Sequence, residues 1–125
     1  MPLTGQRILL VEDEIIIAFD IKAIIRKANG EVAAHAANLA AALRLADTPN
    51  LSLAILDFRL GREDSLPVAK KLHEAQVPFL FHTGHAAALS ELWPLVPIVH
   101  KPAAPENLIS ALVSLLTKRP SYAAA

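Results

Sequence analysis

The sequence predicts an α/β protein in which helices cover both faces of a five-stranded parallel sheet. Five short segments are almost wholly apolar, as strands buried on both faces of a sheet tend to be. The stretches between them carry apolar residues at intervals of three and four, the period of an amphipathic helix. Because the two kinds of segment alternate along the chain, a parallel sheet with crossover helices is the simplest arrangement.

The expected strands are the apolar segments themselves. The first, RILLV at residues 7–11, is short and apolar, and the second, EVAAHA at residues 31–36, is a weaker pattern. The remaining strands are expected at residues 51–57, 77–83 and 96–100.

The first helix is predicted after the first strand, over residues 14–28. Its inner face is expected to consist of the apolar residues Ile17, Ile21, Ile24 and Ala28. Gly30 stands just beyond them, where a helix commonly ends.

Capping residues mark the other helices. Asn38 is expected to cap a helix that runs to about Ala46. Asp64 or Ser65 is expected to cap the next, which runs to about Ala75. A short helix is expected at residues 86–92, and Pro105 opens the last helix, whose predicted inner face is Leu108, Ile109, Leu112, Val113 and Leu116.

Taken in order, these elements form a doubly wound (βα)5 arrangement of the flavodoxin-like type. The chain is expected to be a single domain, residues 1–125, with a core over about residues 6–117 and a tail or linker at 118–125. In an open α/β sheet of this kind, ligands bind at the carboxyl ends of the strands.

Composition excludes several classes of protein. Twelve basic residues balance twelve acidic ones, so the basic excess of a general nucleic-acid-binding protein is missing. No apolar run approaches the length of a membrane span, and the N-terminus lacks the apolar core of a secretion signal. The chain has no cysteine and therefore no disulfide, which is consistent with a reducing, cytoplasmic location.

Polar residues follow four of the five expected strands. Glu12 and Asp13 follow the first, Asp57 ends the third, Thr83 ends the fourth, and Lys101 follows the fifth. Any one of them alone is an ordinary turn or cap residue. Because the carboxyl ends of parallel strands meet at one edge of the sheet, we expect these side chains to converge there.

The predicted cluster favours phosphoryl transfer onto a carboxylate. Crowded carboxylates either hold a proton or are neutralised by a cation, and hard oxygen ligands suit Mg²⁺. The expected metal ligands are Glu12, Asp13, Asp57 and the backbone carbonyl of Arg59. Asp57 would attack the phosphoryl group, while Thr83 and Lys101 would hold its equatorial oxygens.

Two other classes of site fit less well. A phosphatase with an aspartyl nucleophile would need a second acid two residues later, but Arg59 stands there and cannot donate a proton usefully at neutral pH. A flavin or nucleotide site would need a Gly-rich or hydroxyl-rich loop after the first strand, whereas Glu-Asp-Glu at residues 12–14 repels phosphate.

Over about residues 6–117 the chain resembles the receiver domain of two-component response regulators. The resemblance rests on ILLVEDE with Glu12 and Asp13, ILDFRLG with Asp57, FHTG with Thr83, and HKPA with Lys101. It implies Mg²⁺-dependent phosphorylation of Asp57 by a partner histidine kinase or histidine phosphotransfer protein. A cis peptide before Pro102 is also implied, and a receiver that docks partners without phosphorylation is the alternative.

Three departures from that family concern the output mechanism. Ile98 stands where the family usually has a switch aromatic, and the stretch from Thr83 to Lys101 is short. FHTGH resembles a subgroup with a Phe-Ala-Thr-Gly-Tyr-like block, in which His85 takes the place of the tyrosine. Arg59 and His85 would lie at the rim of the site, where they either modulate access or are plain solvated loop residues.

The resemblance also sets expectations for the rest of the surface. Phosphorylation would reshape helices four and five, and strand 96–100 with the last helix could form a homodimer surface. His82 and His100 should point away from Thr83 and Lys101 by strand alternation, into ordinary packing or hydrogen bonds.

Overall fold

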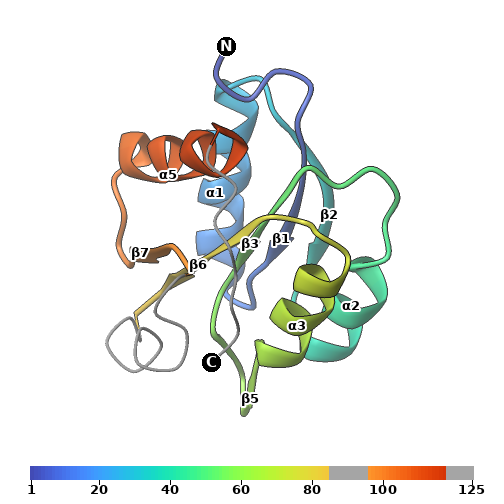
Figure 1. The fold of residues 1–125 in the computed structure, drawn as a ribbon. Coiled ribbons are helices and arrows are strands. Elements are labelled where there is room, and N and C mark those ends of the chain that lie inside the picture. Colours follow the sequence, from blue (N-terminus) through green and yellow to red (C-terminus); the bar gives the residue numbers. More distant parts are fainter. Residues whose placement is uncertain (85–95, 118–125) are drawn as a thin grey trace.

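The computed structural model describes residues 1–84 and 96–117, and its centre is a parallel sheet (Figure 1). Its strands are β1 (Arg7–Val11), β2 (Glu31–Ala36), β3 (Leu53–Leu56), β6 (Phe79–Thr83) and β7 (Ile98–His100). They form one five-stranded sheet in the order β2-β1-β3-β6-β7, with every neighbouring pair parallel. The predicted fold class, a doubly wound α/β sheet, is confirmed.

Helices cover both faces of the sheet. They are α1 (Ile15–Lys27), α2 (Leu39–Leu45), α3 (Leu66–Glu74) and α5 (Pro105–Thr117). In Figure 1, α1 and α5 lie on one face, and α2 and α3 lie on the other. The helix predicted at residues 86–92 lies outside the described residues. Within the described part of the chain, no helix is long and apolar enough to cross a membrane.

The two faces have different cores. The core under α1 and α5 is aliphatic, with Leu10, Ile55 and Leu80 from the sheet. The core under α2 and α3 contains Phe79 and Phe81, whose rings meet edge to face at 5.8 Å. Since all five of these side chains are fully buried, the strands read as continuous apolar runs, as predicted.

The later strands begin two residues after the predicted starts. Pro78 precedes β6 and Pro97 precedes β7, and proline has no N–H for the ladder. Their carbonyls are nevertheless used: Ala54 N–H donates to Pro78 O and Phe81 N–H donates to Pro97 O, both at 3.0 Å. The apolar runs therefore overstated the hydrogen-bonded length.

The buried face of α1 is rotated from the predicted one. Ala18, Ile21 and Ile25 are buried, whereas Ile17 and Ile24 are only half-buried. A similar shift occurs in α5, where Leu115 is buried rather than Leu116. Periodicity locates an apolar stripe, but the neighbouring helix decides which of its residues are covered.

The caps agree with the predictions in part. Asn38 caps α2, and its side chain accepts a hydrogen bond from Ala41 N–H at 2.8 Å. At α3, the side chain that accepts belongs to Asp64, from Leu66 N–H at 2.9 Å. Beyond α1, Asn29 rather than Gly30 takes the left-handed conformation, with φ of 67°.

A small antiparallel hairpin follows β3, where a plain loop was expected. It consists of β4 (Arg59–Leu60) and β5 (Glu63–Asp64). Gly61 opens its turn with φ of 65°, a conformation that glycine adopts without strain. Strands of two residues are too short to produce a period in the sequence.

Candidate functional site

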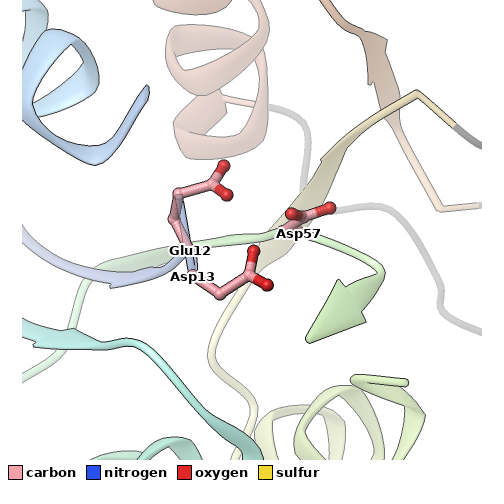
Figure 2. A group of neighbouring side chains, drawn as sticks. All are labelled: Glu12, Asp13 and Asp57. Atoms are coloured by element: carbon pink, nitrogen blue, oxygen red, sulfur yellow. The ribbon is translucent and has the colours of Figure 1, made fainter. Parts of the chain in front are cut away.

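The site lies at the carboxyl edge of the sheet, where β1 and β3 end. Glu12 and Asp13 follow β1, and Asp57 follows β3. Figure 2 shows the three carboxylates turned toward a common space. One oxygen of each lies within 4.8 Å of the others. The structure therefore brings together the acids that the sequence placed after two separate strands.

Backbone hydrogen bonds hold these residues beyond the strand ends. Glu12 N–H donates to Ala36 O at 3.0 Å, and Asp57 N–H donates to Val11 O at 2.8 Å. The parallel ladder thus continues for one residue past the last apolar position of each strand. The carboxylates consequently have rigid support from the sheet.

Lys101 enters the same space from the loop after β7. Its Nζ lies 2.8 Å from Glu12 Oε1 and 3.0 Å from Asp57 Oδ2, with only 15% of the side chain exposed. Lys101 N–H also donates to Thr83 O at 2.9 Å. The peptide between Lys101 and Pro102 is cis, as the family resemblance implied. One ammonium therefore bridges two of the three carboxylates.

Burial dominates the electrostatics of Glu12. Its side chain is 1% exposed, and this loss of hydration, with the nearby Asp57 charge, raises the pKa of Glu12 to about 7. Hydrogen bonds from Lys101 and from Glu14 N–H oppose the rise. Like charge was the expected cause of such a shift, but removal of water is the larger one.

Lys101 responds in the opposite sense to its burial. Removal of water alone would lower the pKa of its ammonium, but the contacts with Glu12 and Asp57 raise that pKa above the ordinary value. A single ammonium beside three carboxylates leaves an excess of negative charge. The site therefore favours a further cation.

Asp13 and the β4–β5 hairpin complete the acidic side of the site. Asp13 is half-buried, and its Oδ2 accepts a hydrogen bond from Gly61 N–H at 3.1 Å. Arg59, at the start of β4, is exposed. Carboxylate oxygens at this spacing fit a hard divalent ion such as Mg²⁺, which needs few protein ligands because it retains waters. The residues present thus suit the predicted metal.

The remaining predicted residues lie around this centre. Thr83 is fully buried at the end of β6, opposite His100 in the register. Ile98 is half-buried on β7 and packs against the core that contains Phe81. His85 lies outside the described residues.

Two features near the site were not predicted from the sequence. His82, expected to be ordinarily packed or hydrogen-bonded, is 5% exposed, and its Nδ1 has no hydrogen-bond partner. Ile15, Ile16 and Phe19 at the start of α1 are 83%, 78% and 72% exposed. The run of three isoleucines after Glu14 was a usable signal, because one buried helix face does not need three apolar residues in a row.

Comparison with known families gives one clear result. The sequence profile of the response regulator receiver domain matches residues 8–113. No curated protein sequence matches this chain.

Many solved structures resemble the chain. The solution structure of SdrG from Sphingomonas melonis Fr1 is 31% identical, with a TM-score of 0.79 over 93% of this chain and 98% of that one. A response regulator receiver protein from Sinorhizobium medicae WSM419 is 28% identical, with a TM-score of 0.80 over 91% and 96%. A CheY-like receiver domain from Methanospirillum hungatei JF-1 is 22% identical and shares the fold, with a TM-score of 0.77 over 91% and 95%.

Proposed function

Because this chain belongs to the response regulator receiver domain family, we propose that it accepts a phosphoryl group on Asp57 in two-component signalling. The observation that carries the proposal is the joint geometry of the site. Three carboxylates approach within 4.8 Å, and Lys101 bridges Glu12 and Asp57. As a receiver it is a signalling domain, and the only reactions we assign to it are its own phosphorylation and dephosphorylation.

The proposed reaction is an in-line phosphoryl transfer. An Asp57 carboxylate oxygen attacks phosphorus in a phosphohistidine, an O–P bond forms, and the N–P bond breaks with its electron pair returning to the imidazole nitrogen. Mg²⁺ held by Glu12, Asp13, Asp57 and the Arg59 carbonyl would supply positive charge against the phosphoryl oxygens. Lys101 and the Thr83 hydroxyl would donate to the other phosphoryl oxygens.

Phosphorylation would release Lys101 from its present pairing. Its Nζ is shared between Glu12 and Asp57, and a phosphoryl group on Asp57 offers it a more strongly charged acceptor. Since Lys101 N–H is bonded to Thr83 O, the loops after β6 and β7 would respond together. Ile98 would occupy the switch position in place of an aromatic ring, and Arg59 and His85 would modulate access at the rim.

We propose a cytoplasmic histidine kinase or histidine phosphotransfer protein as the phosphodonor. The exposed Ile15, Ile16 and Phe19 begin two residues after Asp13, so they border the site that a donor histidine must reach. A large exposed apolar patch beside a reactive centre is typical of a protein contact. A homodimer through β7 and α5 remains a second proposal for the far side of the domain.

Phosphorylation of the purified chain tests the function. Incubation with Mg²⁺ and acetyl phosphate should add one phosphoryl group by intact-mass spectrometry, and both Asp57→Ala and removal of Mg²⁺ should abolish the gain. Asp64→Ala, which alters another carboxylate of the same loop region, should retain it. A domain that binds no Mg²⁺ and gains no mass would instead be a docking-only receiver.

A further inference from the structure

A cavity of about 320 Å³ lies between α1, α5 and the end of β6. Its aliphatic walls are Ile17, Ile21 and Ile24 of α1 with Leu108 of α5. These α1 residues are the stripe predicted for the core, two of which remain only half-buried. The gap between the two helices therefore leaves apolar surface that the fold itself does not cover, in a space large enough for a small ligand.

One buried polar group lines this cavity without a partner. His82 is 5% exposed, and no hydrogen bond reaches its Nδ1. Among the described residues, two other buried side-chain atoms lack partners, on Arg7 and Ser65, and neither residue lines the cavity. Buried polar atoms are nearly always hydrogen-bonded, because an unmet one is costly. His82 is therefore suited to a ligand that supplies the missing bond.

The charge of the cavity limits the class of ligand. Burial, and then the Lys101 charge, lower the pKa of His82 to about 4, so its ring is neutral near pH 7. Asp20 is exposed at the mouth, and Lys101 is already paired with Glu12 and Asp57. A charged ligand would lose its hydration without gaining a free partner deep in the cavity. A hydroxyl group can donate or accept, and so can bond to either tautomer of the imidazole.

We propose that the cavity between α1 and α5 binds a small neutral molecule with an apolar body and one hydroxyl group, which bonds to His82 Nδ1. We further infer that its binding is coupled to phosphorylation of Asp57, because Lys101 both lines the cavity and contacts Asp57. This second part rests on the proposed function, whereas the first does not.

The binding site can be tested with two ligands of the same shape. p-Cresol and p-xylene differ by a hydroxyl in place of a methyl group, and each is titrated into the full chain without Mg²⁺ while methyl NMR signals are followed. Ile21 and Leu108 should shift with both ligands, and p-cresol should bind about tenfold more tightly. Equal affinities, shifts away from these residues, or no binding at all, as in a cavity that holds only water, would overturn the proposal.

Variants separate the role of His82 from that of cavity shape. His82→Leu should bind the two ligands equally, while the matched variant His73→Leu, in α3 on the opposite face of the sheet, should keep the preference for p-cresol. Ile17→Phe, at a half-buried wall position, should weaken both ligands. A His82→Leu protein that still prefers p-cresol would contradict the assignment. Should His82→Leu fail to fold, the comparison of ligands on the unaltered protein still decides.

The coupling has its own readout. The affinity for p-cresol is measured with Mg²⁺ alone and again with acetyl phosphate, after mass spectrometry establishes that the sample is phosphorylated. A change of about fivefold or more is expected in the unaltered protein and none in Asp57→Ala. A phosphorylated sample with unchanged affinity overturns the coupling, whereas a sample that never gains mass contradicts the proposed function instead.

Discussion

Glu12 and His82 are both buried and both feel the charge of Lys101, yet the structure treats them differently. Burial raises the pKa of Glu12 to about 7 and lowers the pKa of His82 to about 4, so each moves toward its neutral form. Glu12 has partners for both oxygens, Lys101 Nζ and Glu14 N–H, whereas His82 Nδ1 has none. Equal burial thus yields a satisfied reactive site and, beside it, a cavity with an unmet polar atom.

The two groups also oppose each other in the pH dependence of folding. Folding raises the pKa of Glu12 from its ordinary value of 4.5 to about 7, so the folded state holds the extra proton and this group makes stability fall as pH rises through that window. Folding lowers the pKa of His82 from its ordinary value of 6.5 to about 4, so the unfolded state holds the extra proton and this group makes stability rise there. The two contributions largely cancel where the windows overlap.

Removal of Lys101 should have the largest effect on the reactive side of this comparison. Lys101→Met leaves two buried carboxylates without their shared cation and should reduce the free energy of unfolding by roughly 3 kcal/mol. Urea denaturation at pH 8 with a chelator measures the loss, which Mg²⁺ should partly restore. Lys71→Met removes a more exposed ion pair to Asp47, 2.9 Å long, and should cost about 1 kcal/mol or less. Equal losses in the two variants would show that Lys101 is not the main counter-charge.

Glu12→Gln should remove the contribution that falls with pH. Relative to the unaltered protein without Mg²⁺, the variant should gain stability as pH rises from 4.5 to 8, by at most about 3 kcal/mol. Its own stability should then rise between pH 4 and 6.5, because the His82 contribution is no longer cancelled. Urea denaturation across pH 4–8 provides the measurement, and a constant difference between the two proteins would contradict the pKa assigned to Glu12.

His82→Leu should produce the opposite profile. The unmet Nδ1 disappears, and the contribution that rises between pH 4 and 6.5 disappears with it, so the variant should gain most in relative stability at low pH. Its stability should fall between pH 4.5 and 7, where Glu12 now acts alone. The same denaturation series measures this profile, with His73→Leu as the matched control. A curve parallel to that of the unaltered protein would mean that His82 does not titrate differently on folding.

Ile16→Ser should have the smallest effect on stability. Its side chain is 78% exposed and contributes to neither buried group, so unfolding should change by less than about 0.5 kcal/mol and the pH profile should be unaltered. Phosphorylation by acetyl phosphate should be unchanged, while transfer from a partner histidine kinase should slow. Slowing with both donors would place Ile16 in the site rather than in a docking surface.

The sequence by itself determined the order of elements and the edge at which the site forms. Apolar runs and helical periods depend only on which faces must be buried, and parallel strands necessarily bring their carboxyl ends together. The approach of Glu12, Asp13 and Asp57 to within 4.8 Å followed from that rule, as did the cap at Asn38 from local chemistry.

Only the tertiary structure decided how these groups are surrounded. The pKa of Glu12 depends on burial by other segments, and strand alternation assigns His82 to a face without saying whether a donor or acceptor meets it there. The cavity exists because α1 and α5, far apart in sequence, pack with a gap at residues that periodicity had assigned to the core. Such distances between segments are set by packing of the whole domain, to which a local pattern carries no reference.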